Sequence, residues 1–160
     1  MEITLHQKSQ DALLWIVKIL NKHKVSYQIA GGLAAKVYGA KRDLADIDID
    51  IPLSAFQMII EDVKEYVVTG PQSMKDQNWN SYLMTLNYQG QEIDLSSSED
   101  VMIFNQNTKA WEELPTDLSQ AEKVDLMGVE IYVISKENLL FYKKKLRRQV
   151  DLLDIEALEK

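Results

Sequence analysis

The stretch "DIDIDIP", from Asp46 to Pro52, constrains the fold of this chain more than any other. Acidic and apolar residues alternate there with a period of two, which predicts a β-strand that ends at the proline. Successive side chains of a strand point to opposite faces, so Asp46, Asp48 and Asp50 share one face and the three isoleucines share the other. We expect the isoleucines in a core, and the aspartates at a place where something neutralises their charge.

The remaining patterns predict an α+β fold, a small mixed β-sheet with helices packed on it, in a single domain spanning 1–160. Helical periodicity predicts helices over 9–24, 33–39, 55–67, 136–149 and 150–160. Strand patterns predict a strand over 25–30 and hairpins over 81–97 and 123–135. Ser54 and Gln57 are spaced as a capping box for the third helix, and Ser135 precedes the fourth. Residues 99–120 give no clear pattern.

Composition excludes several kinds of chemistry. The 160 residues contain no cysteine and only two histidines, His6 and His23. Disulfides, thiolate nucleophiles, cysteine-ligated zinc and histidine-rich metal sites are therefore excluded. The net charge of −7 argues against a sequence-independent grip on nucleic acid. Since neither a secretory signal pattern nor a long apolar run is present, we expect a soluble cytoplasmic protein that does not enter the membrane.

A double glycine, Gly31–Gly32, lies between the strand over 25–30 and the helix over 33–39. A helix that starts there leaves free backbone N–H groups, and glycine lets a ligand approach them closely, so the turn suits a phosphate. A tight turn without a ligand remains the alternative. Lys41 and Arg42 follow the helix and are candidates to clamp a triphosphate, or else they are simply a basic helix exit.

A further acidic face is predicted in "QEIDLSS", where Glu92 and Asp94 alternate with apolar residues. If this strand pairs beside the aspartate strand, Asp94 completes a carboxylate cluster with Asp46 and Asp48. Carboxylate oxygens are the ligands that Mg²⁺ prefers. Such a cluster is typical of sites that transfer a phosphoryl or nucleotidyl group between two metal ions.

These motifs together resemble the nucleotidyltransferase superfamily named after DNA polymerase beta. The order of double glycine, basic residue and "DIDID" looks most like the small lincosamide and aminoglycoside nucleotidyltransferases. The residues that fall on the family pattern are Gly31, Gly32, Arg42, Asp46, Asp48 and Asp94. The family's ending is matched by Ser135, Glu137, Leu139, Lys144, Arg147, Asp151 and Asp154. The chain departs from the family in Leu33, where relatives often carry Trp, and in the additional Asp50.

The resemblance implies a Mg²⁺-dependent transfer of a nucleoside monophosphate, from ATP or another nucleoside triphosphate, to a hydroxyl of a small molecule such as a lincosamide or aminoglycoside. Metal would be held by Asp46, Asp48 and Asp94, with Asp94 or Glu92 as the base. The triphosphate would be bound by Gly31, Gly32, Lys41, Arg42 and Lys144. Two alternatives stay open: a toxin–antitoxin-type enzyme acting on RNA or protein, and an inactive nucleotide-binding relative. The oligomeric state is also open, with a homodimer among the possibilities.

Overall fold

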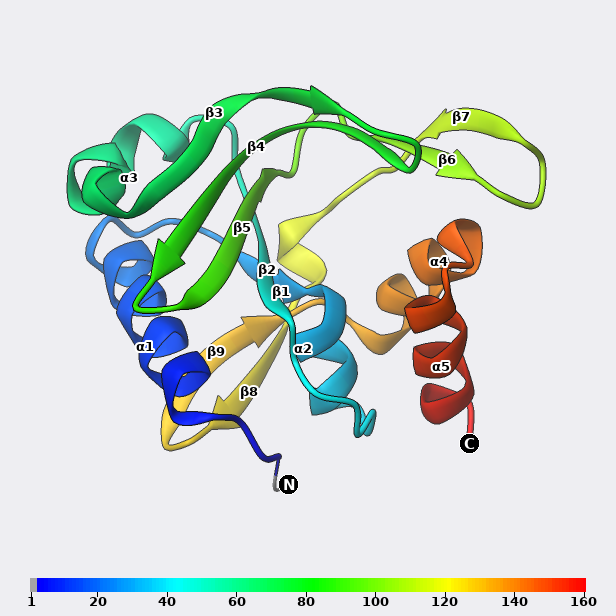
Figure 1. Ribbon diagram of the computed structural model, residues 1–160, viewed down its shortest axis with the longest axis horizontal. Helices are drawn as coiled ribbons and strands as arrows, with labels where there is room; N and C mark the ends of the chain where they lie inside the picture. The colour runs from blue at the N-terminus through cyan, green and yellow to red at the C-terminus, as the bar shows by residue number, and fades with distance from the viewer. Residues whose placement is uncertain (1–2) are drawn as a thin grey trace.

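The computed structural model describes residues 3–160, and within them helices pack on a curled mixed sheet, which confirms the α+β class (Figure 1). The helices are α1 (Gln7–Lys22), α2 (Gly31–Val37), α3 (Ala55–Val63), α4 (Lys136–Leu146) and α5 (Gln149–Leu158). The strands are β1 (Gln28–Ala30), β2 (Asp46–Ile51), β3 (Val67–Lys75), β4 (Trp79–Tyr88), β5 (Gln91–Ser97), β6 (Met102–Asn105), β7 (Ala110–Glu113), β8 (Glu122–Leu126) and β9 (Val129–Val133). Short 3-10 turns occupy Lys64–Tyr66 and Leu118–Gln120. Between residues 3 and 160, no helix combines the length and the apolar composition that a bilayer crossing requires.

The strand order is β7-β6-β4-β5-β2-β1-β9-β8, and β3 pairs with β4. The central strand β2 runs parallel to β5 and antiparallel to β1. Figure 1 shows β3 and β4 passing over the top of the molecule toward β6 and β7, while α4 and α5 stand on the same side below them. The sheet therefore curls, and its concave part faces the two C-terminal helices.

The alternation of acidic and apolar residues in β2 places the two kinds of side chain on opposite faces, as predicted. Ile47, Ile49 and Ile51 are fully buried in the main core, whereas the three aspartates on the other face are only partly buried. Full burial of each isoleucine contributes about 1.5–3 kcal/mol relative to an exposed side chain. A slip of one residue would bury the carboxylates in place of the isoleucines, so the register of β2 is strongly fixed.

Three strands, β3, β6 and β7, have no counterpart in the sequence prediction. Gly70 and Pro71 interrupt the pattern of β3, and its pairing with β4 shifts register across that segment. The strand persists because β4 supplies hydrogen-bond partners on either side of the irregularity. The pairing, and not the alternation of its own side chains, holds β3 in place.

Helix termini gave one correct and one wrong prediction. The fourth helix starts where predicted, directly after Ser135, whose side chain caps α4 by accepting a hydrogen bond from the Asn138 N–H at 3.1 Å. Ser54 makes no side-chain cap and has helical backbone angles, so the predicted capping box is wrong. The turn that follows Pro52 satisfies this helix start differently: the Ala55 N–H donates to the Pro52 carbonyl at 2.9 Å.

The helix predicted over 136–149 ends earlier, at Leu146. Arg147 has a left-handed backbone, with φ of 51°, and α5 begins two residues later at Gln149. The chain thus turns sharply between Lys145 and Gln149. This turn decides which basic side chains face the inside of the molecule.

Candidate active site

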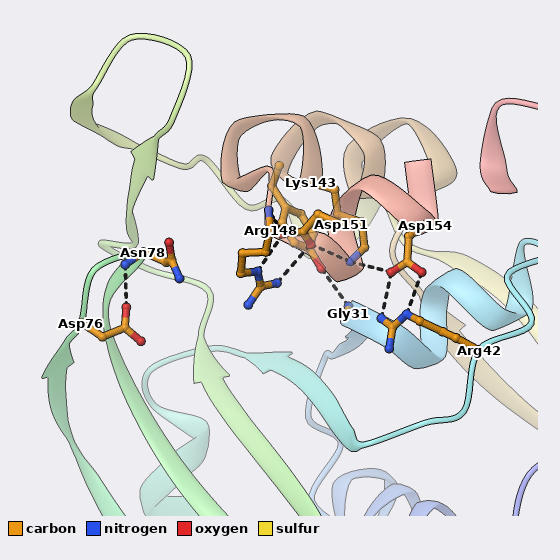
Figure 2. Close-up of polar contacts among 9 residues, drawn as sticks. Gly31, Arg42, Asp76, Asn78, Lys143, Arg148, Asp151 and Asp154 are labelled. Carbon is orange, nitrogen blue, oxygen red and sulfur yellow. Dashed lines mark hydrogen bonds and ion pairs between the residues drawn. The ribbon is translucent and has the colours of Figure 1, made fainter. Parts of the chain in front are cut away.

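A cavity of about 880 Å³ lies between the acidic face of the sheet, the β3–β4 turn and the two C-terminal helices. In Figure 2, Asp76 and Asn78 of the β3–β4 turn lie on one side, the polar side chains of α4 and α5 lie on the other, and an open space separates the two groups. Side chains from β1, β2 and β5 form the floor of the cavity. The aspartates predicted to need neutralisation therefore line this cavity.

The pairing on which the predicted carboxylate cluster depends is confirmed. In the parallel ladder of β2 and β5, Asp46 lies opposite Glu92, and Asp48 lies opposite Asp94. Carboxylate oxygens of Asp46, Glu92 and Asp94 all lie within 4.8 Å of one another. Asp94 is further held by the Thr85 hydroxyl, which donates to Oδ1 at 2.7 Å. These three side chains could hold a divalent cation, and Glu92 belongs to the group as fully as Asp94.

Asp48 lies next to the double glycine. Gly31 has φ of 58°, and a Cβ added there would overlap Oδ2 of Asp48. The backbone N–H of Gly31 donates to the Tyr142 hydroxyl at 2.8 Å. The neighbouring Gly32 lies against the guanidinium of Arg42, whose Nη2 would stand 3.0 Å from an added Cβ. Both glycines are needed for close approach, because they let a carboxylate and a guanidinium pack directly on the start of α2.

The negative charge of the β2 carboxylates is little compensated by neighbouring cations. Burial, followed by the charges of Asp46 and Asp94, raises the pKa of Asp48 well above its usual range. Burial is also the main cause that raises the pKa of Asp46 and of Asp94. Burial raises the pKa of Asp50 to about 6, although a hydrogen bond of 2.9 Å from Gln28 opposes the shift. This wall of the cavity has surplus negative charge that a bound cation would relieve.

The facing wall holds a paired cluster, which we call the ionic cluster: Arg42, Lys143, Arg148, Asp151 and Asp154 (Figure 2). Lys143 Nζ lies 3.1 Å from Asp151 and 3.0 Å from Asp154. Arg42 donates twice to Asp154, at 2.8 Å each. Burial alone would raise the pKa of both aspartates, but the hydrogen bonds and charges of these cations outweigh it and hold both pKa values below the usual range.

No protein-family model and no curated protein matches this sequence. Solved structures do match it. A protein from Thermotoga maritima, assigned as a nucleotidyltransferase, superposes with a TM-score of 0.71 at 20% identity, covering 98% of this chain and 91% of the other. The lincosamide antibiotic adenylyltransferase LnuA, bound to lincomycin, gives 0.63 at 17% identity and covers 99% of each chain. ANT(2'')-Ia in complex with adenylyl-2''-tobramycin gives 0.59 at 14% identity, covering 94% and 87%.

The chain has the nucleotidyltransferase fold. At sequence identities of 14–20%, the structural similarity establishes the fold. It therefore confirms, for the fold, the resemblance that the glycine and aspartate motifs indicated.

Seven of the nine residues that the sequence nominated line the cavity of this nucleotidyltransferase fold: Gly31, Gly32, Arg42, Asp46, Asp48, Glu92 and Asp94. The two that do not are Lys41 and Lys144. Lys41 is exposed. Lys144 is half-exposed, and its Nζ lies 3.3 Å from Glu159 on the outer side of the helices.

Lys143 and Arg148 line the cavity, whereas the family-based assignment named Lys144 as the lysine that binds the triphosphate. Three consecutive lysines, from 143 to 145, gave the sequence no means of choosing among them. A usable signal was Asp151 and Asp154, which are three residues apart and so share a face of α5. Both are buried, and a buried carboxylate requires a partner.

An apolar and aromatic portion completes the cavity. Trp79 and Phe141 line it from β4 and α4, and Phe141 is exposed. The Trp79 ring meets Tyr142 edge-on, with ring centroids 5.7 Å apart. The cavity thus joins two charged walls to a surface on which a ring or an apolar group could pack.

Proposed function

We propose that the protein transfers a nucleoside monophosphate from a nucleoside triphosphate to a hydroxyl group of a small molecule and releases pyrophosphate. One observation carries the proposal: a single cavity on a nucleotidyltransferase fold has a wall of convergent carboxylates facing a wall of cations. The carboxylates suit a divalent metal, and the cations suit phosphates. The proposal also takes the chain to act as a single domain in the cytoplasm, where nucleoside triphosphates are abundant.

The residues fit Mg²⁺. All the candidate ligands are carboxylate oxygens, from Asp46, Asp48, Asp94 and Glu92, and three of these side chains converge within 4.8 Å. Hard oxygen donors with surplus negative charge favour a small divalent cation. When bound, Mg²⁺ would neutralise the triphosphate and lower the pKa of the attacking hydroxyl.

The residues of the chain itself position the reactants. Arg42, Lys143 and Arg148 supply charged donors for the phosphate oxygens along one wall. Gly31 and Gly32 let the Asp48 carboxylate and the Arg42 guanidinium lie against the start of α2, where these two side chains would meet the metal and the phosphates. Catalysis on this account comes from alignment of the two substrates and from fixed charges, with no covalent intermediate on the protein.

Asp94 is the proposed base for the acceptor hydroxyl. The Thr85 hydroxyl fixes one of its oxygens, and burial raises its pKa, which improves it as a proton acceptor. Glu92 is its competitor, because it lies two residues away on the same face. If Asp94 is the base, Asp94→Asn should lose turnover even with saturating Mg²⁺ and both substrates, while Glu92→Gln should retain most of it.

We propose an acceptor that combines a reactive hydroxyl with a ring or an apolar portion, because Trp79 and Phe141 line the space beyond the carboxylates. Two of the structurally similar proteins are antibiotic adenylyltransferases, one bound to lincomycin and one to an adenylylated tobramycin. Lincosamides and aminoglycosides are therefore the first acceptors to test, with ATP as the first donor.

The test is incubation of the protein with each labelled nucleoside triphosphate, Mg²⁺ and a panel of hydroxyl-bearing antibiotics, followed by mass spectrometry. We expect one acceptor to gain the mass of one nucleoside monophosphate, with an equal amount of pyrophosphate released. Asp46→Asn should abolish the product, and Glu159→Gln, outside the cavity, should leave it unchanged. If no donor yields pyrophosphate above the level of Asp46→Asn with any acceptor in the panel, the proposed reaction is contradicted.

A further inference from the structure

The ionic cluster has more positive than negative charge. Arg42, Lys143 and Arg148 are paired with only two carboxylates, Asp151 and Asp154, and the exposed fraction of the Lys143, Asp151 and Asp154 side chains is 1% or less. A cluster that served only to join α4 to α5 would need no surplus cation. The surplus lies on the two arginines, because the side chains of Arg42 and Arg148 are 25% and 42% exposed, and an anion in the cavity can meet it there.

The cluster also has a definite direction. All three cations line the cavity, whereas neither Asp151 nor Asp154 does. The carboxylates therefore lie behind the cations and contact them from the side of α5, which leaves the cations between the two aspartates and the cavity. Figure 2 shows this arrangement, with Asp151 and Asp154 on α5 and the guanidinium of Arg148 extended toward the space in front of the β3–β4 turn.

The two aspartates leave the cations little freedom. Asp151 accepts from the backbone N–H of Arg148 at 3.0 Å, from its Nε at 2.7 Å, from its Nη2 at 3.1 Å and from Lys143 Nζ at 3.1 Å. Asp154 holds Arg42 in a two-bond fork and also contacts Lys143. Lys143 thus bridges the two carboxylates, and the three cations form one connected unit whose spacing is set by α5.

The ionic cluster is coupled to the start of α2 and to the carboxylates of β2. Tyr142, next to Lys143 in α4, accepts the N–H of Gly31. Arg42 packs over Gly32. The charge of Lys143 also acts on Asp48 across the cavity, where it opposes the rise of that carboxyl's pKa. A displacement of the cluster would therefore change the place where phosphates meet metal.

We infer that Asp151 and Asp154 are positioning residues, which hold Lys143, Arg42 and Arg148 at the spacing that binds the pyrophosphate portion of the nucleotide. The inference rests on the proposed function for the identity of the anion. Neither aspartate touches the substrate: each acts through the cations in front of it. The surplus positive charge of the cluster is then balanced when the nucleotide enters.

The Asp151→Asn variant distinguishes a positioning role of Asp151 from a purely electrostatic effect on anion binding. It raises the net charge of the ionic cluster from about +1 to +2, so attraction alone would tighten the binding of an anion. If Asp151 positions the cations, binding should instead weaken, by about 10-fold to 100-fold, the usual range when the supporting partner of a ligand-binding group is removed. The measurement is titration calorimetry of inorganic pyrophosphate with Mg²⁺, well below the melting temperature of each variant. Tighter or unchanged binding would overturn the inference.

Arg42→Lys provides a second test if Asp151→Asn folds poorly. It keeps the charge but loses the planar fork that matches Asp154, and the Arg42 side chain is a quarter exposed, so the fold should tolerate it. We expect weaker pyrophosphate binding and a KM for the triphosphate that rises more than kcat falls. Pyrophosphate affinity equal to wild type in this variant would contradict positioning.

The matched control is Glu159→Gln, which removes the partner of Lys144 from the same pair of helices on the exposed side. It should leave pyrophosphate affinity unchanged. Since the titration contains no acceptor and no nucleoside, the inference and the proposed reaction fail separately. A wild-type protein that binds pyrophosphate but transfers nothing would contradict the reaction alone.

Discussion

Two groups of charged side chains face each other across the cavity, and they differ in how their charge is compensated. On β2 and β5 the group is acidic throughout: Asp46, Asp48, Asp50, Glu92 and Asp94. On α4 and α5 the two acids are fully paired with cations from the chain itself. Burial raises the pKa values of the β2 aspartates, whereas pairing lowers those of Asp151 and Asp154.

On the proposed function, the difference separates carboxylates that would be neutralised by a bound metal ion from carboxylates that are already paired within the chain. An uncompensated carboxylate reduces the stability of the empty protein, so its presence is explained by what it binds. A paired buried carboxylate stabilises its neighbours, and removing it strands their charge. The same substitution of aspartate by asparagine should therefore affect stability with opposite sign in the two regions.

The largest effect is expected on catalysis from Asp48→Asn. It removes a carboxylate from the acidic wall next to Gly31, and we expect transfer to fall on the order of 100-fold to 1000-fold, as when a fixed charge-stabilising group is lost. The measurement is pyrophosphate release at saturating Mg²⁺ and both substrates. Wild-type turnover in this variant would remove Asp48 from the site.

The next effect concerns stability and the ionic cluster. Asp154→Asn should lower the free energy of unfolding by about 3 kcal/mol, because Arg42 loses the carboxylate that pairs with it and the buried Lys143 keeps only Asp151. Urea unfolding followed by circular dichroism measures this. A loss no larger than that of Glu159→Gln would show that the pairing contributes little.

A smaller effect is expected from the glycine that joins the two regions. Gly31→Ala should cost about 1–2 kcal/mol for its left-handed backbone, and the added Cβ also displaces the Asp48 carboxylate. Gly32→Ala is the comparison, since Gly32 has no left-handed backbone and its added Cβ would instead press on the Arg42 guanidinium, with Nη2 3.0 Å away. A Gly31→Ala variant as stable as wild type would contradict the backbone strain assigned to this position.

The pH dependence of stability offers the finest comparison. In metal-free buffer the native state binds more protons than the unfolded chain wherever a carboxyl pKa is raised, so stability should fall as pH rises from about 4 to about 6, the window set by Asp50. The lowered pKa values of Asp151 and Asp154 act oppositely, and their contribution is lost as pH falls below about 4. Asp50→Asn should reduce this slope, to which the raised pKa values of Asp46, Asp48 and Asp94 also contribute, and should leave the acid limb unchanged. A slope unchanged by that substitution would contradict the assignment.

The acidic wall could be predicted from sequence because its signal is local. Alternation of charged and apolar residues fixed the faces of β2 and of β5, and the shared requirement of both strands for a polar surface suggested their pairing. The structure confirms it in the register of Asp48 with Asp94.

The ionic cluster could not be predicted in the same way. Which of three successive lysines turns inward depends on the rotation of α4 and on the left-handed residue, Arg147, that ends it. Neither is visible as a pattern. The strands β3, β6 and β7 were missed for a related reason: their neighbours in the sheet stabilise them more than their own residue order does.

The most direct test of the contrast is one pair of unfolding free energies, measured for Asp48→Asn and Asp154→Asn against wild type at pH 7 with EDTA. The account predicts that Asp48→Asn is more stable than wild type, since one uncompensated carboxylate is gone, and that Asp154→Asn is less stable. Adding Mg²⁺ and ATP should then stabilise wild type more than Asp48→Asn. If Asp48→Asn unfolds more easily than wild type in EDTA, the acidic wall is part of the structural support, and the central claim is contradicted.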